Sequence, residues 1–189
     1  MKKIKNILAF IILGAYLTGC SDINFIGASI PKVNSGINAS SYSTLDNKSF
    51  ILKHSYKLDP QVAENIAGYV NYYSKINNVD SKLVLSLMAK ESSFRANAIS
   101  SAGAIGLGQL MEGTAKDMGV TDRYDAEENT KGTIKYISWL LKRTNGDVDK
   151  ALASYNMGPG AVERISKSGG ELPSSVKKYV SDIKSYFEA

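Results

Sequence analysis

Two reactive kinds of side chain are almost absent from this 189-residue sequence, which contains one cysteine and one histidine. A single cysteine excludes an intramolecular disulfide. Cys20 and His54 together supply too few ligands for a zinc site, and they exclude Ser-His or Cys-His catalysis in the main domain. We therefore expect no metal and no cofactor, and we expect His54 to be a polar linker residue.

The sequence also lacks an apolar run long enough to cross a membrane. The apolar stretch 7–19 follows Lys2, Lys3 and Lys5, and as a helix it would reach about 20 Å, against a hydrocarbon core of about 30 Å. A short apolar run behind a basic start is typical of a signal peptide, which we place at residues 1–19.

A large excess of charge of one sign is missing once that segment is set aside. The chain has 23 Lys and Arg against 18 Asp and Glu, and residues 1–20 hold three of the lysines and no acid. Residues 21–189 therefore carry 20 basic and 18 acidic side chains, a net charge of +2. With no basic cluster, a nucleic-acid partner is not expected.

The single cysteine has a specific setting. The stretch "LTGC", ending at Cys20, resembles a bacterial lipobox, in which a signal peptidase cuts before the cysteine and its sulfur is acylated. Several acyl chains would anchor the chain stably in a lipid bilayer. Ser21, where an aspartate would signal inner-membrane retention, favours the outer membrane facing the periplasm. The alternative is an ordinary secretory signal with an incidental cysteine.

Composition divides the rest of the chain at about residue 57. Residues 21–57 include eight serines and no sustained periodicity, which predicts a flexible tether over 20–57 behind the lipidated end. From 58 to 189, apolar positions recur at helical spacing between glycines and prolines, and no pair of alternating strands is present. We expect an all-α domain with helices opened at Asp59-Pro60, Asp80, about Ile105, about Ala126, Asp147, Pro159 and Pro173.

Glu91 is out of place in this helical pattern. It lies three, four and seven residues after Met88, Leu87 and Val84, on the face where a core residue belongs, while the polar Lys82, Ser86 and Lys90 define the opposite face. A helix-terminal glutamate that bends to solvent is the ordinary explanation. A carboxyl beside a ligand-sized gap would instead have a raised pKa, as a general acid requires.

The residues after Glu91 favour the second explanation. "SSAGAIGLGQ" (100–109) has almost no large side chains, so its backbone can approach a ligand closely. A phosphate-binding loop is a weak match, because no strand precedes the segment and no Gly-Lys-Ser/Thr follows it.

Three stretches together carry a family pattern. "ESSFRANAISSAGAIGLGQLM", "ALASYNMGPGAV" and "LPSSVKKYV" resemble the lytic transglycosylases of the soluble-lytic-transglycosylase (SLT) type, within the lysozyme-like superfamily. The resemblance covers about residues 58–189 and implies a lysozyme-like helical domain whose glutamate-bearing helix faces a glycan groove. It also implies cleavage of the β-1,4 bond between N-acetylmuramic acid and N-acetylglucosamine in peptidoglycan, without water, leaving a 1,6-anhydromuramoyl end.

The resemblance also implies the site. Glu91 would be the sole general acid and base, because the substrate's acetamido group serves as nucleophile and its O6 hydroxyl as acceptor; typical glycosidases need two carboxyls. Tyr155 would place its hydroxyl near the acid. The residues expected to bind substrate are Ser92, Ser100, Gln109, Met111, Tyr155 and Asn156.

One departure from the family pattern bears on the groove: glycine stands at Gly108, where the family often has methionine, which predicts a wider groove beside the acid. Two other functions remain open. One is a lysozyme-like hydrolase, in which water replaces the O6 hydroxyl, and the other is a non-catalytic peptidoglycan-binding lipoprotein. The expected partners are glycan strands and a lipid bilayer, the latter through acylated Cys20. General wall turnover and local opening of the wall for an envelope machine both fit the sequence.

Overall fold

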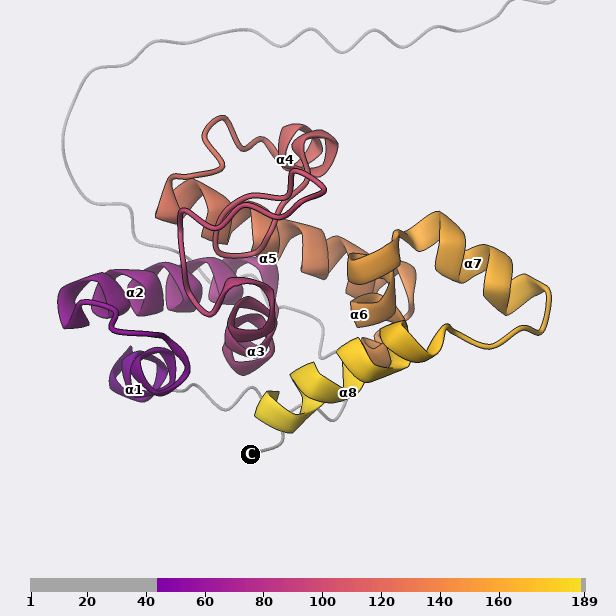
Figure 1. Ribbon diagram of the computed structural model, residues 1–189, viewed down its shortest axis with the longest axis horizontal. Helices are drawn as coiled ribbons and strands as arrows, with labels where there is room; N and C mark the ends of the chain where they lie inside the picture. Colours follow the sequence, from indigo (N-terminus) through magenta and orange to yellow (C-terminus); the bar gives the residue numbers. More distant parts are fainter. Residues whose placement is uncertain (1–43, 188–189) are drawn as a thin grey trace, which may run out of the picture. The chain divides into compact units, whose positions relative to one another are not determined.

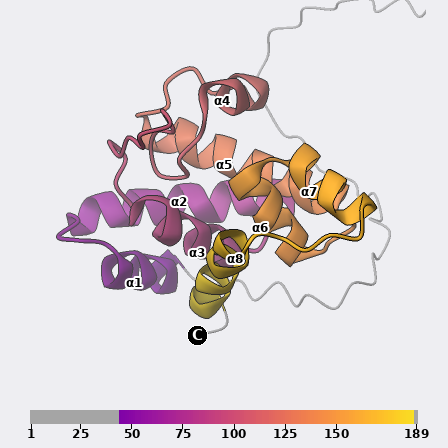
Figure 2. The same cartoon turned by 45° about the vertical axis from the view of Figure 1, so that its right-hand side comes forward.

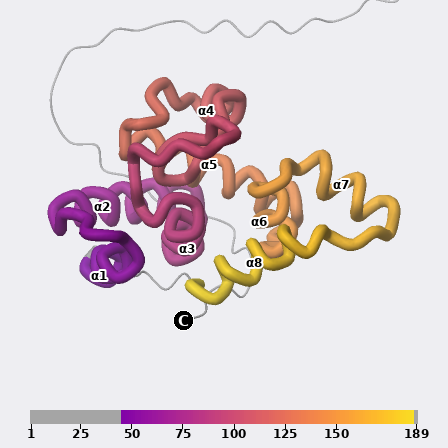
Figure 3. Tube along the Cα trace, viewed as in Figure 1, coloured from indigo at the N-terminus to yellow at the C-terminus, as the bar shows by residue number. Residues whose placement is uncertain are grey.

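The computed structural model describes residues 44–187, and it folds them into eight α-helices. Figure 1 shows their arrangement, Figure 2 a rotated view and Figure 3 the course of the backbone. The helices are α1 Thr44–His54, α2 Pro60–Asn77, α3 Ser81–Ser92, α4 Glu112–Met118, α5 Ala126–Arg143, α6 Val148–Met157, α7 Pro159–Lys167 and α8 Ser174–Phe187. β-Pairing in the described part is limited to two isolated bridges, so the expected all-α class is confirmed.

Helix starts follow the predicted caps. The carboxylate of Asp59 accepts hydrogen bonds from the backbone N–H groups of the first turn of α2, and Asp80 and Asp147 do the same for α3 and α6. Such a side chain satisfies donors that have no partner within the helix. Proline begins α7, where its missing N–H costs nothing.

Helix α3 lies at the centre of the domain. It contacts α1, α2, α5 and α8, and every residue from Leu83 to Ala89 is buried. Ser86 was expected on a polar, exposed face of this helix, and that prediction is wrong. The side chain is fully buried, and its hydroxyl donates to the carbonyl of Lys82 over 2.7 Å. Lys90 keeps its charge at the surface by pairing with Asp182 of α8 over 2.7 Å. A helix enclosed by neighbours carries apolar residues on all sides.

Two further expectations require correction. Residues 44–54, expected within the flexible tether, form α1, which packs on α2 and α3 through the fully buried Ile51. His54, at its end, is no linker residue, since its ring lies 4.3 Å from that of Phe50 and 4.9 Å from that of Tyr186. The helix expected to open at about Ile105 begins only at Glu112, because residues 105–110 form turns around the isolated bridges.

Within residues 44–187, no helix is both long and apolar enough to span a bilayer. Cys20, the signal peptide and most of the expected tether lie outside the described residues.

Candidate active site

The end of α3 places Glu91 at the edge of the core. Ser93 and Phe94 follow with φ angles of +51° and +62°, a left-handed conformation that ends the helix and turns the chain away. Such angles are costly for residues other than glycine, and the burial of Phe94, which is 1% exposed, holds them in place. Glu91 is left half-buried just before this turn, with its carboxyl directed at a neighbouring helix.

That neighbour is α8, and its Tyr179 donates its phenolic hydroxyl to Oε1 of Glu91 in a short hydrogen bond. The tyrosine is buried by the packing of α8 on α3. Tyr179 lies in the family-like stretch "LPSSVKKYV", but its spacing from Val176 and Ile183 is that of a core residue, and no polar contact was expected there. Tyr179 is therefore a site residue that sequence reasoning missed.

The environment sets the protonation state of Glu91. Burial raises the pKa of Glu91 to about 7, although the hydrogen bond from Tyr179 and the positive charge of Lys90 act in the opposite direction. Burial and the adjacent carboxylate in turn raise the pKa of Tyr179 well above 10, so it remains a donor. Near neutral pH both forms of Glu91 are populated, which suits a group that must give a proton and later take one.

The Tyr179→Phe variant tests this coupling. Loss of the donor should raise the pKa of Glu91 further and move the alkaline limb of the pH–activity profile upward, while turnover falls about 10- to 100-fold, as expected for a lost hydrogen bond to a charged group. Tyr186→Phe, on the same helix but in contact with His54, is the matched control. An unshifted profile in Tyr179→Phe would show that the tyrosine does not tune the acid.

The glycine-rich segment is held in shape by Asn129 of α5. This buried amide accepts from the N–H of Gly108 over 2.8 Å and donates to the carbonyls of Ile105 and Arg123 over 3.0 and 2.8 Å. An ideal Cβ added to Gly106 would lie 2.2 Å from the Asn129 side chain. Nothing in the local sequence marks Asn129, since its partners lie more than 20 residues away along the chain except for Arg123.

The predicted widening of the groove at Gly108 is wrong. The side chain of Thr133 fills the space that a side chain at this position would need, because an ideal Cβ on Gly108 would lie 1.9 Å from Thr133 Oγ1. The glycine therefore lets α5 approach the segment closely and leaves no opening.

Tyr155 also fixes this segment. Its hydroxyl donates to the carbonyl of Gly108 over 2.7 Å, whereas the hydrogen bond to the acid comes from Tyr179. Burial is the main reason why the pKa of Tyr155 is raised, and the charge of the Glu91 carboxylate raises it further. The Tyr155 hydroxyl therefore lies close to Glu91.

Ser92 is the one predicted substrate-binding residue whose environment argues against that role. It is 1% exposed, and its hydroxyl donates to the carbonyls of Leu107 and Met88 over 2.8 and 3.4 Å. These hydrogen bonds join α3 to the glycine-rich segment. Because the Ser92 side chain is buried and its hydroxyl already donates to backbone carbonyls, it is not exposed for contact with a ligand.

The remaining predicted residues lie in or beside the segment, or at the end of α6. The hydroxyl of Ser100 accepts from the N–H of Ala104 over 3.0 Å, and the side-chain amide of Gln109 donates to the carbonyls of Ala98 and Gly106 over 3.1 and 3.0 Å. Met111 is 46% exposed, and Asn156 is exposed in the last turn of α6.

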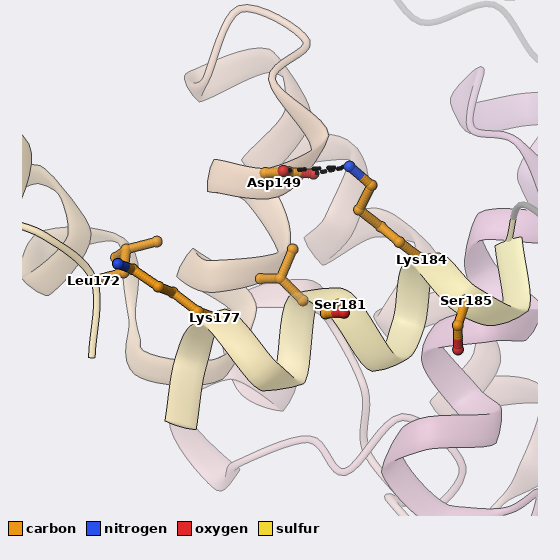
Figure 4. Close-up of a pocket in the computed structure, with 7 residues that line it drawn as sticks. Asp149, Leu172, Lys177, Ser181, Lys184 and Ser185 are labelled. Carbon is orange, nitrogen blue, oxygen red and sulfur yellow. Dashed lines mark hydrogen bonds and ion pairs between the residues drawn. The ribbon is translucent and has the colours of Figure 1, made fainter. Parts of the chain in front are cut away.

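A separate pocket of about 420 Å³ lies along α8, beyond these residues. Figure 4 shows the residues that line it, with Lys184 of α8 paired to Asp149 of α6. Lys177, its other cation, pairs with Glu171. Among the described residues, no group of three or more His, Cys, Asp or Glu side chains could hold a metal ion.

The all-helical domain, with Glu91 half-buried at the end of its central helix, shares the lysozyme-like helical fold of two solved structures. Among solved structures, the chain is similar to an inactive glutamate-to-glutamine mutant of lytic transglycosylase Slt from Pseudomonas aeruginosa, with a TM-score of 0.60 and 22% identity over 76% of this chain and 29% of that one. It is also similar to the 70 kDa soluble lytic transglycosylase SLT70 from Escherichia coli, with a TM-score of 0.61 and 19% identity over 79% and 30% of the two chains.

Residues 68–176 match the family "Transglycosylase SLT domain", and the chain belongs to this family. It is 33% identical over 143 residues to the membrane-bound lytic murein transglycosylase F of Shewanella woodyi, covering 71% of this chain and 28% of that protein. The protein of the same name from Desulfosudis oleivorans is 38% identical over 103 residues, covering 50% and 23%. The chain thus spans about a quarter of the length of these curated relatives.

Proposed function

We propose that this protein is a peptidoglycan lytic transglycosylase that cleaves the β-1,4 bond between N-acetylmuramic acid and N-acetylglucosamine and leaves a 1,6-anhydromuramoyl end. The observation that carries the proposal is the Glu91 carboxyl of an SLT-family domain, with its pKa raised to about 7 and a hydrogen bond from Tyr179. The curated relatives named above are lytic murein transglycosylases, which supports the substrate class.

In the first step, protonated Glu91 gives its proton to the glycosidic oxygen, and the bond from that oxygen to the anomeric carbon breaks. The acetamido oxygen of the same muramic acid residue forms the new bond to that carbon. The Tyr179 hydrogen bond holds the carboxyl in place and stabilises the carboxylate that results.

In the second step, the carboxylate of Glu91 takes the proton of the O6 hydroxyl, and this oxygen displaces the acetamido oxygen at the anomeric carbon. The acid is restored and no water is consumed. One carboxyl is enough for both steps.

We propose that the sugars are contacted by Ser100, Gln109, Met111 and Asn156. Tyr155 supports the glycine-rich segment through its hydrogen bond to Gly108. Digestion of purified sacculi tests the function as a whole. Anhydro-ended muropeptides are the expected product, whereas reducing ends would indicate a hydrolase and intact sacculi a non-catalytic binding protein.

We further propose that acylated Cys20 anchors the protein in the outer membrane, facing the periplasm. The lipobox-like "LTGC" supports this, as does the description of the relatives as membrane-bound. Anchored in this way, the domain would reach glycan strands close to the bilayer. Cleavage there could open the wall locally for an envelope machine.

The Cys20→Ala variant should stay unprocessed and leave the detergent-extracted membrane fraction, because the acyl chains supply the affinity for the bilayer. Intact-mass analysis and fractionation measure both effects, and Ser21→Ala is the matched control. Unchanged mass and membrane partitioning in Cys20→Ala would refute the anchor.

A further inference from the structure

Trp139, the only tryptophan of the chain, lies on α5 and is 42% exposed. It lies in a concave place, since it lines a pocket of about 420 Å³ between α4, α5 and the start of α7, helices that can be followed in Figure 1. The pocket is lined by Thr114, Asp117, Met118, Tyr136, Trp139 and Pro159. An exposed tryptophan inside a pocket differs from a single apolar residue on a convex surface, which needs no explanation.

Two aromatic rings form one wall of this pocket. Tyr136 and Trp139 lie on the same face of α5, with ring centroids 6.1 Å apart and planes only 14° from parallel. We call this pair the aromatic shelf. The guanidinium of Arg143, one turn further along, lies 5.5 Å from the Trp139 ring. Across the pocket, Thr114 and the exposed Asp117 of α4 supply hydrogen-bonding groups.

The shelf is connected to the proposed catalytic centre. The Tyr136 ring lies 5.1 Å from the ring of Tyr155, which bonds Gly108 and is affected by the charge of Glu91. Met118, another pocket residue, packs with Tyr155 on the small cluster formed by Leu110, Ala115 and Val120. The pocket is therefore joined to the surroundings of Glu91 by packed side chains, through Tyr136, Met118 and Tyr155.

We propose that the aromatic shelf is a distal sugar-binding subsite, which holds one pyranose ring of the glycan strand away from the bond that is cut. A pyranose has an apolar face of C–H groups and a rim of hydroxyls, which match a flat aromatic wall facing polar side chains. A polymer bound at Glu91 must also extend beyond it, and Tyr136 of the shelf contacts Tyr155, whose pKa the Glu91 charge affects. This inference rests on the proposed function, since it assumes a glycan substrate.

Binding is measured on full-length protein carrying Glu91→Gln, so that the ligand is not consumed. The ligands are peptide-free strands of alternating N-acetylglucosamine and N-acetylmuramic acid, one short enough to occupy only the surroundings of residue 91 and one several times longer. Trp139→Ala is compared with Trp139→Tyr, which keeps a ring, and with Tyr72→Ala, an exposed aromatic on α2 that pairs with Tyr73.

We expect Trp139→Ala to lower the ratio of long-strand to short-strand affinity about tenfold, with recovery in Trp139→Tyr and no change in Tyr72→Ala. Because Trp139 is the only tryptophan, long strands should also shift the emission of the protein with Trp139 intact, and short strands should not.

An unchanged ratio in Trp139→Ala, or an equal loss for both strands, would overturn the subsite while leaving the proposed function standing. Absence of binding by every variant to either strand would overturn both.

Discussion

Replacing Glu91 by glutamine should reduce the release of muropeptides from sacculi by about 10⁴-fold or more. General acid–base catalysis by one group contributes about 10²- to 10⁴-fold, and Glu91 performs both proton transfers in the proposed reaction. Glutamine has nearly the same size and still accepts from Tyr179, so the loss reports the missing proton and not a displaced helix. Glu112→Gln, at an exposed glutamate in the first turn of α4, is the control and should keep wild-type rates.

The same variant should be more stable than the wild type, in a way that depends on pH. Glu91 has a pKa of about 7 in the folded protein, above its ordinary value of 4.5, so the folded state binds this proton more tightly than the unfolded state does. The stability that protonated Glu91 contributes is complete below pH 4.5 and is lost as the pH rises through 7. Unfolding free energies of Glu91→Gln and wild type should thus coincide near pH 4 and differ by about 3 kcal/mol above pH 7.

An active Glu91→Gln variant with lowered stability at neutral pH would identify Glu91 as a structural, charge-paired residue. Urea unfolding at several pH values, performed beside the sacculus assay on the same preparations, separates the two roles.

The second large effect is expected at Gly108. A methyl group there would lie 1.9 Å from Thr133 Oγ1 and 2.9 Å from Thr133 Cβ, so Gly108→Ala must push the segment away from α5. Overpacking of this kind costs about 1–3 kcal/mol of folding stability. The displaced backbone also holds Tyr155 and Asn129, and a shift of about 1 Å can reduce turnover about 100-fold.

A second substitution makes this test specific. Thr133→Gly removes the obstructing side chain at a cost of about 1 kcal/mol for a glycine within a helix. The double variant Gly108→Ala/Thr133→Gly should therefore recover part of the activity and be more stable than the two single changes predict by addition. Gly113→Ala is the matched control, since nothing lies within 4 Å of its added Cβ and alanine favours the helix. Additive losses in the double variant would show that the two positions do not share this space.

Local signals predicted much of the helical framework. Carboxylates at Asp59, Asp80 and Asp147 satisfy first-turn N–H groups whatever the tertiary context, and α5 begins at Ala126, where its start was expected. Helix α1 was missed because its weak amphipathic pattern is stabilised from outside, by Ile51 in the core and by the hydrogen bond from Asn47 to Asn71 of α2. Propensity is a weak guide where packing decides.

The site was predictable only in part, for the same reason. Glu91 could be found because a carboxyl interrupts an apolar face, and this conflict lies within one helix. Asn129 acts through partners distant in sequence, and no local pattern records those contacts. Tyr179 lies in the family-like stretch "LPSSVKKYV", but its apolar spacing indicated the core, and its partner Glu91 is 88 residues away. Ser92 was misassigned because a motif gives the position of a residue and says nothing of whether its hydroxyl is already bonded to backbone.

In the proposed reaction Glu91 directs the substrate's own O6 hydroxyl, and not water, to the anomeric carbon. Digestion of sacculi in ¹⁸O-labelled water, followed by mass analysis of the muropeptides, distinguishes the two acceptors. We expect anhydro-ended products that contain no label and are lighter than the reducing products by one water, with none formed by Glu91→Gln. Reducing ends that carry ¹⁸O as the main product of the wild type would contradict it.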